Sequence, residues 1–251
     1  MSDSTTPPLC VADDATFWPW HPWTDFAAWA DKANTVVVIP MAGLADWGIG
    51  HALDAEETVS LAVLKQASQK FEPKNKLLVI PPLRFQFGAD PNCAFAILPD
   101  AAHAQLQEVC SCIAGAGFKK IVLYNSSPWS EEFCSGAGRD IRIALSVQMF
   151  AIHLSALDLD FHPVRSKSRK TLQTVITALT GHLPEPPPSP AATTRGWGDE
   201  TILPLTETSL SLADAVVATP AILEAAATKL AALLKDIEAR PLKIESLAYP
   251  S

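Results

Sequence analysis

Polar side chains that could bind a metal ion or act on a substrate follow two hydrophobic runs of this 251-residue chain. Asp46, His51 and Glu57 follow the first run, and Asn125 and Ser127 follow a later one. Two carboxylates, an imidazole, an amide and a hydroxyl form a hard-oxygen set that holds a divalent ion weakly. These five residues are the candidate site, provided that the fold brings them together.

The hydrophobic runs alternate with helical patterns. Thr35 to Pro40, Lys76 to Ile80 and Lys119 to Tyr124 are β-branched or aliphatic runs typical of buried strands. Between them lie two segments with helical spacing of apolar residues, Ala55 to Phe71 and Pro99 to Ala116. This alternation predicts an α/β fold with a parallel sheet, helices on both faces and ligand sites at the carboxyl ends of the strands.

The remaining segments complete the predicted domain. A fourth strand is expected within Val147 to Leu157. We divide the chain into a Trp- and Pro-rich arm, residues 1–23, and a single domain, residues 24–251, with a Pro-rich loop near 184–200. Further helices are predicted at Thr24 to Lys32, Arg139 to Leu145, Lys167 to Leu179 and Pro220 to Ala239, the last with Thr219 as its cap and Pro220 in its first position.

Composition limits the partners of the chain. Lys and Arg number 19 against 27 Asp and Glu, which gives a formal charge of -8 and argues against a nucleic-acid partner. No apolar stretch approaches the ~18 to 20 residues needed to cross a bilayer, so we expect no membrane association and a cytoplasmic location. The five cysteines are odd in number and lack zinc-site spacing, and we expect reduced thiols.

Three segments resemble the creatininase family of amidohydrolases. IPMAGLADWGIGHALDAEET is similar to the family motif G-x-x-E-x-H-G-x-H-x-P-x-x-T-D, and PPLRFQFGADPNCAF is similar to P-P-x-x-Y-G-x-S-x-x-H-x-x-F. GAGFKKIVLYN is similar to the segment that precedes the family's G-H-G-G-N. The resemblance covers about Pro22 to Leu154. It implies a three-layer creatininase-like fold and chemistry in which two divalent ions activate a water against a carbon–nitrogen bond.

The resemblance also implies roles for the candidate site. If one extra residue precedes Gly43, Asp46 and Glu57 take the two carboxylate positions of the first motif and would be metal ligands. His51 matches the second histidine of that motif, in the neighbourhood of the site, and Asn125 matches a retained asparagine, so both would be catalytic residues.

Other family ligands are replaced in this chain. Two liganding histidines fall on Gly48 and Ser127, and Ser127 joins the residues expected to be catalytic. We therefore expect no dinuclear centre and at most one divalent ion, Zn, Mn or Fe. An alignment without the extra residue puts Ala45 and Glu56 at the two carboxylate positions and fits the motif less well.

Structural explanations compete with these roles. Asp54 and Glu57 have the spacing of a helix capping box, and we give capping and metal binding at Glu57 equal weight. His51 on its own is more often a hydrogen-bonded loop histidine. Cys93 and Cys134 lack a histidine at a recognisable spacing, so small buried side chains are the favoured interpretation over nucleophiles.

Three hypotheses of function remain open. The favoured one is a creatininase-like protein with reduced or lost hydrolase activity and a binding or assembly role. The second is an active metal-dependent hydrolase of an amide or cyclic amide, with one ion on Asp46, Glu57 and His51. The third and weakest is a site rebuilt around Trp47, Trp129 and Cys93 for a flat or apolar small molecule.

The N-terminal arm suggests assembly. Trp18, Trp20 and Trp23 lie among prolines and must bury against a sheet edge or a neighbouring subunit. We expect a homo-oligomer, and the family resemblance implies a hexamer.

Overall fold

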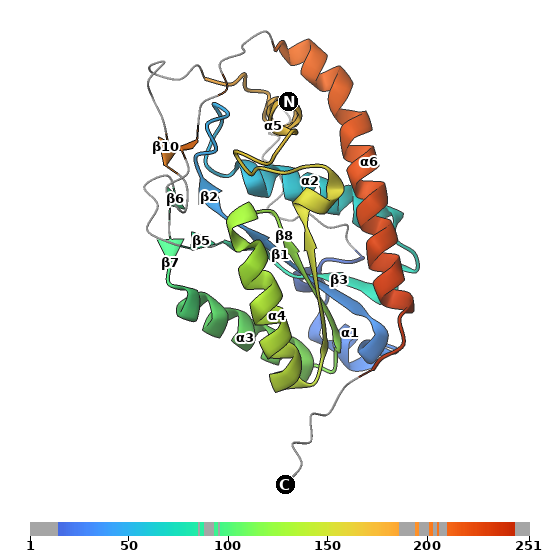
Figure 1. Cartoon of the computed structure of the whole chain (residues 1–251). Helices are drawn as coiled ribbons and strands as arrows, with labels where there is room; N and C mark the ends of the chain where they lie inside the picture. Colours follow the sequence, from blue (N-terminus) through green and yellow to red (C-terminus); the bar gives the residue numbers. More distant parts are fainter. Residues whose placement is uncertain are drawn as a thin grey trace.

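The structure is a computed structural model that describes residues 15–84, 86–87, 93–94, 96–185, 194–195, 201–202, 205 and 210–243. A parallel sheet lies between two layers of helices (Figure 1). Its strands are β3 (Leu77–Val79), β1 (Val36–Ala42), β8 (Lys120–Asn125) and β9 (Gln148–His153), in that spatial order. All neighbouring pairs are parallel, which confirms the predicted α/β sheet with helices on both faces and its four strands.

Shorter strands extend the carboxyl end of this sheet. β4 (Leu83–Arg84) pairs in parallel with the end of β1, past β3. Three small pairs lie outside the main sheet: β2 (Leu44–Ala45) with β6 (Cys93–Ala94), β5 (Gln86–Phe87) with β7 (Ala96–Ile97), and β10 (Thr194–Arg195) with β11 (Thr201–Ile202).

The alternation of side chains along the strands builds two cores. Val36 and Val38 of β1 belong to one buried cluster, whereas Val37 and Ile39 belong to the other, because successive strand residues point to opposite faces. One face packs against α2 (Ala55–Lys70), α5 (Arg169–Thr180) and α6 (Leu212–Ala239), and the other packs against α1 (Trp23–Ala28), α3 (Pro99–Gly115) and α4 (Glu131–Leu145).

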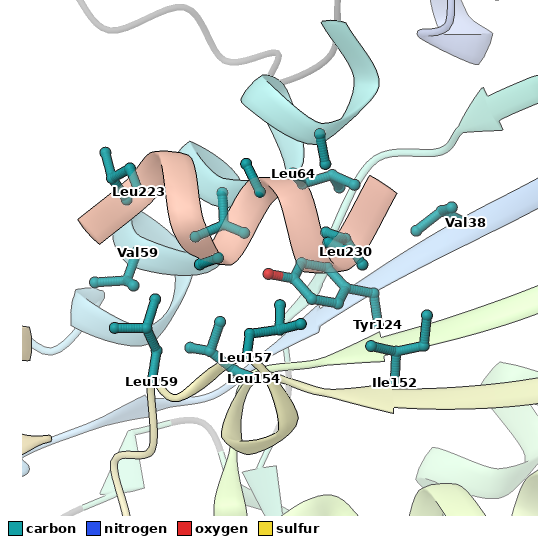
Figure 2. Packing of buried hydrophobic residues seen from close by; sticks show 14 of the residues in the cluster. Val38, Val59, Leu64, Tyr124, Ile152, Leu154, Leu157, Leu159, Leu223 and Leu230 are labelled. Atoms are coloured by element: carbon teal, nitrogen blue, oxygen red, sulfur yellow. The ribbon is translucent and has the colours of Figure 1, made fainter. Parts of the chain in front are cut away.

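Figure 2 shows the first cluster from close by, where α6 lies over α2 and their apolar side chains meet those of the strands. Leu223 and Leu230 of α6 point into this cluster together with Val59 and Leu64 of α2. Tyr124 of β8 is also fully buried there, and its hydroxyl donates to Ser60 O at 3.2 Å. The cluster therefore fixes α2, and with it the polar residues at the start of α2, against the sheet.

Two predicted helices have markedly different ends in the structure. The first helix covers only Trp23–Ala28 and is followed by the 3-10 turn η2 (Lys32–Asn34), because Trp29 takes an extended conformation. α4 begins at Glu131 rather than at Arg139, after the 3-10 turn η4 (Pro128–Ser130). Its first two turns contain glycine at 136 and 138, which lowers intrinsic helix propensity and hid this part from sequence analysis.

The prediction that Thr219 and Pro220 begin the last helix was wrong. α6 begins at Leu212, and the side chain of Ser211 accepts a hydrogen bond from the backbone N–H of Asp214 as its cap. Pro220 lies inside the helix on its exposed side, where a proline removes one backbone hydrogen bond. Buried residues on both sides of Pro220 hold the helix together through packing.

α6 also corrects the prediction that no apolar segment of the chain is long enough to cross a bilayer. By length and composition alone, Leu212–Ala239 could cross a membrane, with a mean hydropathy of 1.5 in its most apolar window. In this structure the helix packs along α2 and α5, and the core helix of a soluble protein passes the same test. One such helix is weak evidence for a membrane span.

The N-terminal arm covers the edge of the sheet next to β3. Phe17 forms a parallel bridge with Val79, and the backbone N–H of Val79 donates to Thr16 O at 2.8 Å. Trp18, in the 3-10 turn η1 (Trp18–Trp20), stacks on Phe26 with ring centroids 4.6 Å apart. This part of the arm therefore packs within its own subunit.

A buried lysine at the amino end of β8 fixes the end of α6. Lys120, the first residue of β8, is fully buried, and its ammonium donates to Glu238 O at 2.7 Å and to Arg240 O at 2.6 Å. The last carbonyls of a helix lack partners within the helix and lie at the negative end of its dipole. Lys120 thereby satisfies two carbonyls and ties the helix end to the sheet.

Lys120→Met keeps the aliphatic stem of the side chain but leaves those carbonyls without their donor. We expect the free energy of unfolding to fall by about 1 to 3 kcal/mol, measured by urea denaturation. The matched control is Lys119→Met, at the neighbouring position, which should change stability by less than about 0.5 kcal/mol. Equal effects of the two substitutions would contradict this role of Lys120.

Candidate functional site

The candidate site lies at the carboxyl end of the sheet, where β1 and β8 are neighbours. The chain leaves β1 toward α2 on one face and leaves β8 toward α4 on the other face. Such a change of direction marks the usual place for a ligand in this class of fold. The segments that meet there are the loop after β1, the first turn of α2 and the loop after β8.

Glu56 lies at this end of the sheet with no solvent exposure. Its Oε2 accepts a hydrogen bond from the backbone N–H of Gly43 at 2.8 Å. The hydroxyl of Ser126 lies 3.3 Å from the same oxygen and 3.0 Å from Met41 O. One carboxyl oxygen is thus held by neutral donors from the loops after β1 and β8.

Two further polar groups lie near this carboxyl. The indole of Trp47 and the hydroxyl of Ser127 lie near Glu56, but outside hydrogen-bond geometry. Trp47 is brought inward by a tight turn, in which the N–H of Gly48 donates to Asp46 Oδ1 at 2.8 Å. Gly48 has a φ of 62°, in the left-handed region that glycine adopts at little cost.

Burial dominates the electrostatics of Glu56. Removal from water raises the pKa of its carboxyl to about 7, although the nearby donors Gly43, Ser126, Trp47 and Ser127 favour the charged form. This carboxyl therefore changes its protonation state near neutral pH.

Aromatic rings pack beside the Glu56 carboxyl. The rings of Trp47 and Trp129 have centroids 5.1 Å apart, and Phe161 lies 5.7 Å from Trp47 on another side. His162 meets the Trp129 ring edge-on at 5.4 Å. Trp47 is only 2% exposed, so these rings form a packed aromatic wall at the carboxyl edge.

An ion-pair network fixes the loop that carries Phe161 and His162. The guanidinium of Arg165 pairs with Asp160 at 2.8 Å and with Glu131 at 2.5 Å, so it joins this loop to the first turn of α4. Ser155, in the 3-10 turn η5 (Leu154–Leu157), donates to the same Glu131 carboxyl at 2.7 Å.

Asn125 lies between the loop after β8 and the next strand. Its amide donates to Ser127 O at 2.7 Å, and it lies 3.3 Å from Nδ1 of His153, the residue opposite it on β9. Burial lowers the pKa of His153, so the neutral imidazole is favoured. Asn125 thereby shapes the loop that presents Ser126 and Ser127 to Glu56.

The other predicted site residues have separate partners. Glu57 forms two hydrogen bonds with the guanidinium of Arg84, at 2.6 and 2.7 Å. His51 Nε2 lies 3.2 Å from Thr177 Oγ1 on α5, and burial lowers the pKa of this histidine. The charge of Asp46 faces Arg169, whose pKa it raises against the larger lowering caused by burial.

The alternative structural roles are only partly observed. Asp54 is the N-cap residue of α2, as predicted, but its side chain makes no capping hydrogen bond, so the predicted capping box does not form. Cys134 is fully buried 3.9 Å from the sulfur of Met41, and burial raises the pKa of its thiol to about 12, which suits an inert thiol. Cys93 belongs to β6, and its side chain lies outside the part of the chain that the structure describes. Among the described cysteines, Cys110, Cys112 and Cys134 are free.

Sequence analysis missed two residues at this edge. The alignment that puts Glu56 at a carboxylate position fits the family motif less well, so the sequence does not select Glu56. His153 was available as the polar end of the predicted fourth strand, next to Asn125. The signal in both cases was position at a strand end or helix start, independent of any motif.

The described side chains do not fit a dinuclear metal centre. Within the part of the chain that the structure describes, no three His, Cys, Asp or Glu side chains come close enough to hold a metal ion together. Of the groups nearest to Glu56, the Gly43 N–H and the Trp47 indole have no lone pair for a metal ion, and the hydroxyls of Ser126 and Ser127 supply fewer oxygens than a dinuclear centre needs.

Comparison with known proteins identifies the fold. No protein-family model matches the sequence, and no curated protein matches it. A crystal structure of creatinine amidohydrolase (creatininase) superposes with a TM-score of 0.64 at 15% sequence identity, over 91% of this chain and 100% of that protein. This chain has the creatininase fold.

Two further structures with the creatininase fold are similar to this chain. A putative creatinine amidohydrolase from Bacteroides fragilis NCTC 9343 has a TM-score of 0.65 at 11% identity, over 92% of this chain and 100% of its own. A structure described as creatininase Mn has a TM-score of 0.64 at 15% identity, over 90% of this chain and 99% of its own. The creatininase-like fold expected from the sequence is confirmed.

The pKa of Glu56 predicts how stability depends on pH. Because the folded-state pKa of about 7 lies above the ordinary value of 4.5, this group's contribution to stability is fully present below pH 4.5 and is lost as pH rises through 7. The loss amounts to roughly 3 kcal/mol at most. Glu56→Gln should remove this part of the pH dependence.

The measurement is urea denaturation of both proteins between pH 4.5 and 8. Burial lowers the pKa values of His51 and His153, which gives a pH dependence of opposite sign, so only the difference between wild type and variant reports on Glu56. Glu132→Gln, at an exposed position of α4, is the control. If Glu56→Gln kept the full wild-type slope, the assignment of this titration to Glu56 would be wrong.

Proposed function

We propose that this protein has the creatininase fold with reduced or lost metal-dependent hydrolysis, and that it serves in binding or assembly. The observation that carries the proposal is the environment of Glu56. This carboxyl lies at the switch point of the sheet, yet its neighbours are the N–H of Gly43 and the side chains of Trp47, Ser126 and Ser127.

The polarity of these neighbours supports the proposal. N–H and O–H donors direct hydrogen atoms toward the carboxyl and stabilise its charge without a cation. A metal ion at the same place would meet the hydrogen of the Trp47 indole, which has no lone pair to offer. The Trp47 ring is in turn packed against Trp129, with ring centroids 5.1 Å apart.

The alternative is an active hydrolase with one ion on Asp46, Glu57 and His51. It would require two of these side chains to leave their present partners. Glu57 would have to leave its two-bond ion pair with Arg84, and His51 would have to leave Thr177. An ion held by so few groups would also activate water less than a dinuclear centre would. The separate partners of these side chains therefore favour the first proposal.

Metal content and hydrolysis test the proposal directly. Protein purified without a metal-affinity tag, then incubated with Zn²⁺ or Mn²⁺ and desalted, should contain far less than one metal ion per chain by mass spectrometry. It should also show no hydrolysis of creatinine or of linear amides above the rate without protein. Creatininase, treated in parallel, is the positive control.

A stoichiometric metal ion accompanied by amide hydrolysis would overturn the proposal. Asp46→Asn and Glu57→Gln would then show whether the alternative ligand set is responsible, because each should reduce metal content together with activity. Glu132→Gln is the control for a carboxylate outside the site.

We further propose that the protein is a homo-oligomer in which the exposed part of the N-terminal arm contacts a neighbouring subunit. Trp20 and Trp23 are 49% and 78% exposed, although Trp18 beside them packs on Phe26. Tryptophan is enriched at interfaces because a large apolar ring is combined with one hydrogen-bond donor. Trp20 and Trp23 are three residues apart, and two exposed rings so close in the sequence suit a contact between copies of the chain.

Trp23→Ser should weaken the oligomer. Point substitution is preferable to deletion of the arm, because deletion would also remove the Phe17 bridge to the sheet edge. Light scattering across a dilution series should show dissociation at a higher protein concentration than for wild type. Leu98→Ser, at another highly exposed position, is the control. A wild-type monomer, or an unchanged mass for Trp23→Ser, would contradict the proposal.

A further inference from the structure

We propose that β9, the last strand of the main sheet, pairs with β9 of a second copy of the chain, antiparallel and about a twofold axis at Ala151. The main sheets of the two copies would then join into one. This interface goes beyond the proposed function, in which Trp20 and Trp23 make the contact between subunits. Either contact can fail without the other.

β9 is an open edge of the sheet. It pairs with β8 on one side, and in the described part of the chain no other hydrogen bond between backbone groups reaches Met149, Ala151 or His153. Ala151 is exposed and four of the six residues of β9 are half-buried, whereas every residue of β1 and β8 is buried. The edge at β3 is instead covered by the N-terminal arm through Phe17.

The sequence of β9 lacks the features that keep sheet edges apart. Edge strands of soluble proteins commonly carry a charge, a proline or a bulge, because a bare edge pairs readily with another chain. Gln148–His153 reads QMFAIH, without Asp, Glu, Lys, Arg or Pro, and all six residues pair with β8 without a bulge. The strand is therefore suited to accept a further strand.

The hydrogen bonds to β8 determine which backbone groups of β9 point outward. The N–H of Gln148 donates to Lys119 O at 2.7 Å, on the β8 side. Along a parallel ladder the residues that bond to the same neighbour alternate, so every second residue from Gln148 faces β8. The residues between them direct their N–H and C=O groups to the open side: Met149, Ala151 and His153.

These outward groups match a second copy of the same strand. With Ala151 opposite itself in an antiparallel pair, Met149 of one copy lies opposite His153 of the other, and each such pair can exchange two hydrogen bonds. Centring the pair on Phe150 or Ile152 instead leaves one outward residue beyond the end of the partner strand. Ala151 also has the smallest side chain of the strand, which lets the two copies approach closely at the axis.

The side chains beside the axis are compatible with this pairing. Phe150 of one copy lies opposite Ile152 of the other on one face of the sheet, an aromatic and β-branched pair of the kind that stabilises neighbouring strands. On the other face Met149 lies opposite His153. Burial lowers the pKa of His153 and favours its neutral form, so the twofold brings no like charges together.

Cysteine cross-linking of the full chain tests the position of the axis. Ala151→Cys places two thiols opposite each other, with Cα atoms about 5.5 Å apart, which a disulfide can span. Incubation with oxidised glutathione should join the two substituted positions, as identified by mass spectrometry of the linked peptides. Met149→Cys is the matched control and should not link to itself, because its two copies lie about 14 Å apart in this register. Equal linking of both variants, or linking of neither, would overturn the inference.

The size of the assembly separates this interface from the arm contact. Trp23→Ser removes only the arm contact, so a dimer through β9 should remain by light scattering. Adding Ala151→Lys should weaken that dimer at least about tenfold, because two like charges then meet at the axis. Ala225→Lys, at an exposed position of α6, is the matched control. A monomeric Trp23→Ser protein, or an unchanged dimer with Ala151→Lys, would overturn this inference without affecting the arm contact.

The end of the same chain is the alternative strand for this edge. The Gln148 amide donates to Pro241 O at 3.0 Å and to Lys243 O at 3.3 Å, so the last described residues lie beside the start of β9. Removal of residues 244–251 should leave the yield of the Ala151→Cys disulfide unchanged. A disulfide that forms only after this truncation would show that the chain covers its own edge, and would overturn the inference.

Discussion

The carboxyl end of the sheet depends on the enclosure of the Glu56 carboxyl by neutral donors. A charged carboxylate without solvent is very costly unless it is hydrogen-bonded or protonated, and both remedies operate here. The N–H of Gly43 and the hydroxyl of Ser126 bond to one oxygen, and burial raises the pKa to about 7. Because these donors come from the loops after β1 and β8, Glu56 cannot be enclosed unless both loops and the first turn of α2 are correctly placed.

The surrounding structure stabilises this arrangement from several directions. Apolar packing of α6 on α2 holds the helix that carries Glu56 against the sheet (Figure 2). The aromatic wall around Trp47 excludes water, and the Arg165 ion pairs hold the loop that supplies part of this wall. The exclusion of water that raises the pKa of Glu56 also makes each remaining hydrogen bond to it stronger. The crevice that holds a ligand in other proteins with parallel sheets is in this way part of the folded core.

The sequence predicted the sheet well because its strands are long aliphatic runs between helical patterns. It could not choose between Glu56 and Glu57, since adjacent helical residues differ in direction by about 100° and only packing decides which one faces inward. The ion pair of Glu57 with Arg84 joins residues 27 positions apart, and no local pattern indicates it. The first two turns of α6 were missed because Pro220 imitates a helix start, whereas Ser211 and tertiary packing set the real one.

Thermal denaturation with and without divalent ions tests most directly whether neutral donors, rather than metal ligation, hold this edge together. A ligand that binds only the folded state raises the apparent stability with the logarithm of one plus the ratio of its concentration to its dissociation constant. The account predicts the same melting temperature for protein treated with a chelator and for protein with excess Zn²⁺ or Mn²⁺. A rise of several degrees with either ion, abolished by Glu56→Gln and kept in Glu132→Gln, would contradict it.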